Sequence, residues 1–245
     1  GVNNVVGEPY SGLTKGCEQW MVAKHQAALE INAVAEALFD LGADCVDLWD
    51  NHGGGGNIDA ADLDPRVKVL VCEPGKSRMY FAGEYDCVCY IGYHAMEGTL
   101  GGVLAHTMSS KTVQHYKLNG RYIGEVDMDA YIAASYGVPS CLFVGGDIAC
   151  AQAERAVPGI VTVITKHEMS RNEAVFRDNN ELFADIKRAF KIMPGKKRIN
   201  VHASPTGARP STEFTGYISG QYPAHILYVR DSARRDAKRL QLDAS

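Results

Sequence analysis

The sequence lacks the features of membrane proteins and of proteins that bind polyanions. No apolar run approaches the roughly 20 residues that a membrane-spanning helix needs. The formal net charge is only −4 over 245 residues, so nothing favours binding to nucleic acid or to an anionic membrane. The opening residues contain no secretory signal peptide, and no internal repeat is visible. We therefore expect a globular, cytoplasmic protein of one or two domains.

The cysteines also form no regular framework. There are seven of them, an odd number, and several lie in apolar runs: Cys72, Cys87, Cys89 and Cys141. This placement is typical of reduced core cysteines in a cytosolic protein. Cys87 and Cys89 could also bind metal, since a spacing of two on a strand points both to the same face. We interpret them as core residues.

Helical and strand-like patterns alternate along the chain. The expected elements are helices over 17–43, 125–137, 148–159 and 179–195, strands over 44–50, 66–74, 85–95, 139–147 and 160–166, and a hairpin around Asn119-Gly120. This order predicts an α/β layered domain with a mostly parallel sheet, assigned to residues 1–190. The basic, loop-rich remainder, 191–245, is predicted to be a small α+β C-terminal lobe with one strand and one helix.

Three polar residues fall where the predicted elements would bring them to one edge of the sheet. His52 and His94 each come just after a buried strand, and Glu125 follows the hairpin and opens a helix. Ligands of open α/β sheets bind beyond the carboxyl ends of the strands. Histidine and carboxylate are ligands of catalytic zinc. Each residue also has an ordinary alternative: a solvated loop histidine, a satisfied buried histidine, and a carboxylate that favours a helix N-terminus.

Two glycine-rich loops belong to the same region. The run "GGGG" at 53–56 has no lysine or following Ser/Thr at the spacing of a phosphate-binding loop, so it is either a flexible tip or a close approach to a ligand. The run "GTLGG" at 98–102 separates His94 from His106. It would let the chain turn sharply and bring His106 back over the site.

The blocks "LWDNH", "GYHA", "LAHTM" and "IGEVDMDAYIAASYGVP", in this order, resemble the DppA-type zinc-dependent D-aminopeptidases. The resemblance runs from about residue 1 to about residue 176 and is most specific over 91–147. It implies a dinuclear zinc hydrolase that removes N-terminal D-residues from short peptides, in a homodecamer with an enclosed chamber. Carried over residue by residue, it implies His52, His94 and Glu125 as metal ligands and His106 as the catalytic histidine.

The start of the chain departs from the family pattern. The family opens with an aspartate, one intervening residue, a glutamate and a glycine, and the two acidic residues complete the metal pair. Here the chain opens "GVNNVVGEP", and Gly1 is expected to be the glycine of that motif. We therefore expect further zinc ligands upstream of Gly1. The alternative is a protein without half of its metal ligands.

Three further roles follow from the expected chemistry, which is hydrolysis of an amide by a metal-activated water. His106 would donate to the developing oxyanion or protonate the leaving amine. Asp50 would orient His52, or else would only cap its strand. Arg171 would bind a substrate carboxylate, or else would form a surface salt bridge.

Three function classes remain open. The first is the D-aminopeptidase implied by the resemblance, acting on a small peptide. The second is the same metal site hydrolysing a different small amide in a catabolic pathway, because a fold and its metal do not fix the substrate. The third is a non-catalytic family member without the full metal set. In each class we expect a homo-oligomer, with neither nucleic acid nor membrane as a partner.

Overall fold

The computed structural model describes residues 1–7, 13–52, 55–192 and 225–230. The helices are α1 (Glu18–Asp40), α2 (Glu125–Ser135), α3 (Asp147–Ala156) and α4 (Asn179–Ile192). The strands of the central sheet are β1 (Cys45–Asp50), β2 (Val67–Leu70), β3 (Cys87–Tyr93), β6 (Ser140–Gly145), β7 (Val161–Ile164) and β10 (His225–Arg230). Two separate hairpins are formed by β4 (Tyr116–Leu118) with β5 (Arg121–Ile123), and by β8 (Lys166–Ser170) with β9 (Glu173–Phe176).

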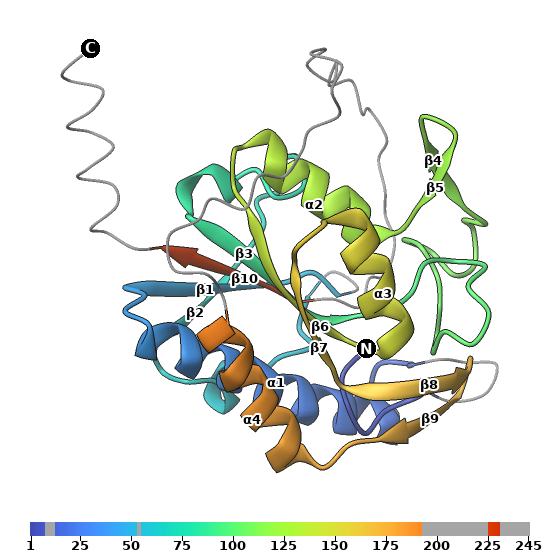
Figure 1. Ribbon diagram of the computed structural model, residues 1–245, viewed down its shortest axis with the longest axis horizontal. Helices are drawn as coiled ribbons and strands as arrows, with labels where there is room; N and C mark the ends of the chain where they lie inside the picture. Colours follow the sequence, from blue (N-terminus) through green and yellow to red (C-terminus); the bar gives the residue numbers. More distant parts are fainter. Residues whose placement is uncertain (8–12, 53–54, 193–224, 231–245) are drawn as a thin grey trace.

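The central sheet is mostly parallel, which confirms the predicted α/β class. Its order is β2-β1-β10-β3-β6-β7. The pairs β1–β2, β3–β6 and β6–β7 are parallel, whereas β10 is antiparallel to both β1 and β3. The sheet has helices on both faces, with α1 and α4 on one and α2 and α3 on the other (Figure 1).

The position of β10 differs from the sequence prediction. Residues 225–230 were assigned to a C-terminal lobe, yet they form an interior strand of the main sheet. The pattern "HILYV" predicts a buried strand but carries no information about its distant partners, so its place could not be derived locally. The remainder of the predicted lobe, including its expected helix, lies outside the described residues.

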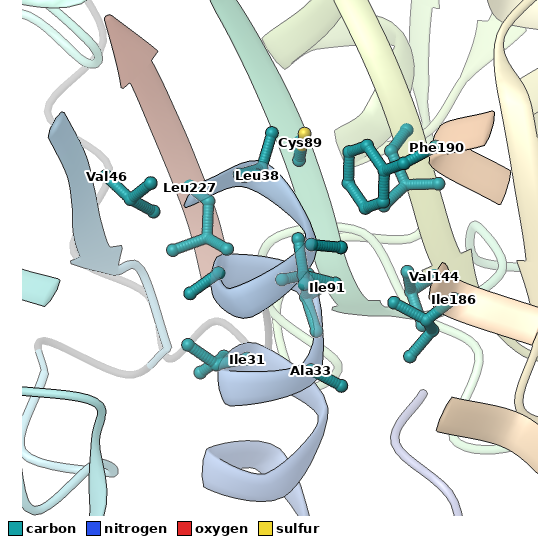
Figure 2. Close-up of a cluster of buried hydrophobic side chains, with 14 of the residues drawn as sticks. Ile31, Ala33, Leu38, Val46, Cys89, Ile91, Val144, Ile186, Phe190 and Leu227 are labelled. Atoms are coloured by element: carbon teal, nitrogen blue, oxygen red, sulfur yellow. The ribbon is translucent and has the colours of Figure 1, made fainter. Parts of the chain in front are cut away.

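The interior strands β3 and β6 are buried on both faces of the sheet and are mostly apolar. Every residue of β3 after Cys87 is buried. On one face, Ile31 and Leu38 of α1 and Ile186 of α4 belong to the same cluster as Ile91, as Figure 2 shows. The buried residues of that cluster also include Cys89, and Cys87 packs against it, in agreement with the core interpretation of both cysteines.

The two hairpins differ in how visible they are in the sequence. Asn119 and Gly120 have φ values of 51° and 80°, so the pair forms the tight turn that was predicted. The hairpin β8–β9 was not predicted, because the segment 166–176 is mostly polar and was interpreted as a connection between a strand and a helix.

The carboxyl ends of β1 and β3 lie at the same edge of the sheet. Asp50 and Ile91 both pair with His225, which is the first residue of β10. Residues that follow β1 and β3 therefore emerge at one edge of the sheet, on either side of His225. Within the described part of the chain, no helix combines the length and apolar character needed to cross a membrane.

Candidate metal centre

Three side chains from separate segments converge just beyond this edge. His94 directly follows β3, His106 ends the glycine-rich loop, and Glu125 is the first residue of α2. One ligand-type atom from each of them lies within 4.8 Å of the others. Glu125 Oε1 is 3.7 Å from His94 Nε2 and 4.0 Å from His106 Nε2. The two imidazole rings are stacked, with centroids 3.9 Å apart.

Backbone contacts fix the orientation of both rings. His94 Nδ1 lies 2.9 Å from the Ala95 carbonyl oxygen, and His106 Nδ1 lies 2.7 Å from that of Leu104. A carbonyl only accepts, so each Nδ1 carries the proton and donates it. The lone pair of each ring is then on Nε2, which faces Glu125. This is the arrangement in which histidine binds metals or accepts a proton.

Two buried polar atoms at this point have no hydrogen-bond partner among the described residues: His94 Nε2 and Glu125 Oε2. The other carboxylate oxygen, Oε1, accepts a hydrogen bond of 2.9 Å from the backbone N–H of Met108. Buried polar atoms without partners are costly, and a cation between them would satisfy both. Two imidazoles and a carboxylate are a suitable donor set for zinc.

Burial favours the uncharged forms of these three groups. Desolvation, with a smaller contribution from His106, lowers the pKa of His94 well below its ordinary value. Desolvation also lowers the pKa of His106 to about 4. It raises the pKa of Glu125 to about 7, while nearby Arg78 opposes the rise. Both histidines are therefore neutral at pH 7, which is the form that binds metal.

The glycine-rich loop folds back as predicted and brings His106 beside His94. The backbone N–H of His106 donates to Ala95 O at 3.2 Å, which closes the loop. A Cβ at Gly102 would lie 2.9 Å from the Cβ of Ala95, so only glycine fits there without displacement.

Arg171 holds the outer side of this loop. Its Nη1 donates to the carbonyl of Ala105 at 2.8 Å, and its own carbonyl accepts from Leu104 N at 2.9 Å. The guanidinium thus contacts the residue before His106. The predicted role of Arg171 in binding a substrate carboxylate stays a prediction.

His52 is not a member of the cluster. The sequence grouped His52, His94 and Glu125, whereas the three clustered residues are His94, His106 and Glu125. His52 follows β1 and lines a pocket that includes Trp20. Desolvation lowers its pKa to about 3, with a further contribution from the charge of His225. Its role as a metal ligand stays a prediction.

Asp50 contacts the backbone around His52. Its carboxylate accepts hydrogen bonds from the backbone N–H groups of Asn57, at 2.7 Å, and of His52, at 3.2 Å. Its Oδ1 is also 3.5 Å from Nδ1 of the buried His225. The sequence analysis missed His225, because only the pairing of β10 brings it to this edge. Whether Asp50 orients the His52 ring stays a prediction.

A buried ion pair behind the cluster was also missed. Arg78, between β2 and β3, pairs with Asp129 of α2. The spacing of Asp129, four residues after Glu125 on one helix, is a signal that could have indicated a shared face.

Two comparisons with known sequences identify relatives of this chain. The chain matches the D-aminopeptidase family Peptidase_M55 over residues 1–242. The D-aminopeptidase of Bacillus subtilis (strain 168) is 30% identical over 141 residues, which cover 57% of this chain and 50% of that relative. The match thus spans about half the length of this curated relative.

A solved structure has the same fold. It is described as the Zn-dependent D-aminopeptidase DppA from Bacillus subtilis, a self-compartmentalizing protease. The TM-score is 0.74 at 19% sequence identity, and the match covers 94% of this chain and 88% of that chain. At this identity the likeness shows the fold alone, whereas the family match extends over nearly the whole sequence. The chain therefore belongs to the Peptidase_M55 family of D-aminopeptidases.

Proposed function

We propose that the protein is a zinc-dependent hydrolase that removes N-terminal D-residues from short peptides. One observation carries this proposal. Two imidazoles and a carboxylate meet within 4.8 Å, and His94 Nε2 and Glu125 Oε2 are buried there without hydrogen-bond partners. Membership of the D-aminopeptidase family supports the choice of substrate class.

His94 and Glu125 would hold the metal. Both side chains are almost fully buried, at 3% and 1% exposure, whereas that of His106 is 10% exposed. Zinc, when bound, supplies a Lewis acid that polarises the scissile carbonyl and lowers the pKa of water. His106 is nearer to solvent, and its neutral Nε2 would accept a proton and return it to the leaving amine.

We further propose that the centre holds two zinc ions, with His52 as another ligand. The family resemblance supports this, as does the position of His52 directly beyond β1. Gly1 N donates to the carbonyl of Gly92 at 2.9 Å, two residues before His94. The first residue of the chain therefore lies at this edge of the sheet, close to the proposed ligands.

A set of variants tests the division of labour between the two histidines. His106→Ala should keep its zinc and lose on the order of 10²–10⁴-fold in kcat, the usual range for general acid–base help. KM should change less. His94→Ala should lose zinc and activity together. Zinc content by mass spectrometry and rates on D-aminoacyl amides give both readouts. His167→Ala is the matched control, since that side chain is 60% exposed.

The outcomes separate the proposals. Loss of zinc from the His106→Ala protein would make His106 a ligand. An unchanged kcat would leave that histidine with a structural role only. A panel of D- and L-aminoacyl amides and dipeptides tests the substrate class, and faster turnover of L-substrates or of other amides would contradict the D-aminopeptidase assignment.

We propose a homodecamer as the assembly, by the family resemblance and because the structural neighbour is described as self-compartmentalizing. Light scattering should then report a particle about ten times the mass of the 26.6 kDa chain. A monomer at micromolar concentration would contradict this assembly.

A further inference from the structure

Arg78 is a mostly buried arginine whose charge acts on Glu125 of the metal centre, and several contacts fix its guanidinium. The guanidinium of Arg78 binds both carboxylate oxygens of Asp129, and Nη2 is 2.7 Å from Oδ2. Asp129 is fully buried, and the Arg78 side chain is only 20% exposed. The guanidinium also lies over the ring of Trp49, 5.2 Å from its centroid. Arg78 is therefore held in one geometry.

The remaining guanidinium nitrogen of Arg78, Nη1, contacts the segment that carries His52. Arg78 Nη1 donates to Asn51 Oδ1 at 2.8 Å. Asn51 is buried and immediately precedes His52. This contact ties the turn after β1 to the arginine.

Asp129 reaches the other two ligand-bearing segments. It lies one helical turn after Glu125 in α2, so its position and that of Glu125 on the helix are coupled. Its Oδ2 also accepts a hydrogen bond of 2.6 Å from the hydroxyl of Tyr93. Tyr93 ends β3 and immediately precedes His94.

We propose that Arg78 is a positioning residue, which clamps the turn after β1, the end of β3 and the start of α2 so that their ligand side chains face one point. The inference rests on the proposed metal site. It assigns to Arg78 no contact with zinc or substrate. A buried ion pair is poor evidence for stability by itself, because apolar residues often replace one at no cost. Here the pair joins three segments that each carry a proposed ligand. His52 and His94 directly follow contacted residues, and Glu125 lies one helical turn before Asp129.

The planar fork of arginine is needed for this role. Arg78 engages two oxygens of Asp129 and, from another nitrogen, the amide of Asn51. A lysine ammonium is a point charge and cannot reproduce the planar, bidentate geometry. Arg78→Lys should therefore keep the charge and lose the clamp.

Metal affinity tests the proposal without relying on turnover. We would measure the zinc Kd by competition with a chelator, and the visible spectrum of the cobalt(II)-loaded protein, which reports ligand geometry. Arg78→Gln and Arg78→Lys should each weaken zinc binding by about 10–100-fold, as expected for partners that orient ligands. Both should also change the cobalt spectrum.

Arg177→Gln provides a matched control. The Arg177 side chain is 21% exposed, close to the value for Arg78, and it also binds one carboxylate, Asp185, and one further oxygen, the carbonyl of Ile164. Within the described part of the chain, these guanidinium contacts reach none of the segments that carry a proposed ligand, so the loss of Arg177 should leave the zinc Kd and the cobalt spectrum unchanged.

The double variant Arg78→Gln/Asp129→Asn separates positioning from stability. Removal of Arg78 alone leaves Asp129 buried with an unpaired charge, and the second change removes that charge. The double variant should regain thermal stability and still bind zinc about 10–100-fold more weakly than the wild type. Recovery of the wild-type zinc Kd and cobalt spectrum would overturn the inference, as would a wild-type Kd for Arg78→Gln. A wild-type protein that binds neither metal would instead refute the proposed function.

Discussion

Replacing Glu30 with glutamine should remove a pH-dependent loss of stability. Glu30 lies in α1 and is fully buried, and its Oε1 accepts hydrogen bonds from Asn3 N at 2.7 Å and Gln26 Nε2 at 3.0 Å. Its Oε2 is buried without a hydrogen-bond partner among the described atoms. Burial is the largest influence on this group, and it raises the pKa of Glu30 from 4.5 to about 7.

The direction of this pH dependence follows from the protons that Glu30 binds in the folded and in the unfolded state. Because the folded-state pKa is above the unfolded value, Glu30 contributes stability that is complete below about pH 4.5 and is lost as the pH rises through about 7. At about 1.36 kcal/mol per pH unit, the loss amounts to about 3.4 kcal/mol. Glutamine keeps an oxygen acceptor for both hydrogen bonds and has no charge to bury, so this loss should vanish.

Urea unfolding of both proteins between pH 4.5 and 7.5 measures the effect. The free energy of unfolding of Glu30→Gln relative to wild type should rise by about 2–3 kcal/mol across this window. Glu125, whose pKa is also raised to about 7, is present in both proteins and cancels in the difference. Lys166, whose pKa is lowered to about 8 and which interacts with the Glu30 charge, contributes a smaller change near the upper end of the window. Glu36→Gln, at an exposed position of the same helix, is the control. If the difference in free energy of unfolding between the two proteins did not vary with pH, ionisation of buried Glu30 would not be the cause of the loss of stability.

Two further predictions concern the core and the loop. Leu48→Ala removes a side chain with no exposed surface from β1, and urea unfolding should show a loss of about 2–5 kcal/mol, whereas Val175→Ala, 56% exposed, should change stability little. Gly102→Ala places a Cβ 2.9 Å from Ala95 and should displace the loop that carries His106, so that kcat falls on the order of 10²-fold while zinc content is retained. An unchanged kcat in that variant would mean that the loop accommodates the methyl group without moving His106.

Much of the fold follows from local patterns in the sequence. The apolar run that became β3 and the Asn119-Gly120 turn are encoded by adjacent residues, and both were predicted. The insertion of β10 between β1 and β3 was not, because strand pairing over this separation depends on tertiary packing. The β8–β9 hairpin was not predicted because its residues are mostly polar and lack an apolar strand pattern. Some of these polar residues contact other segments, and Glu168, for example, accepts a hydrogen bond of 2.8 Å from Val103 N.

The part of the candidate site that could be predicted is the part placed by the ends of strands and the starts of helices. The convergence of His94 with Glu125 followed from their positions after a strand and at the start of a helix. His106 was expected near the site, but its stacking on His94 depends on the conformation of the whole loop. Arg78 and Asp129 appeared as isolated charges in the sequence, since nothing local links residues 51 positions apart.

The proposed metal site requires that His94 and Glu125 hold a zinc ion. A crystal of the zinc-loaded protein, with diffraction data collected on both sides of the zinc absorption edge, locates the ion directly. We expect an anomalous peak about 2.0–2.2 Å from both His94 Nε2 and a carboxylate oxygen of Glu125. A zinc-containing protein whose anomalous peak lies away from these two side chains would contradict it.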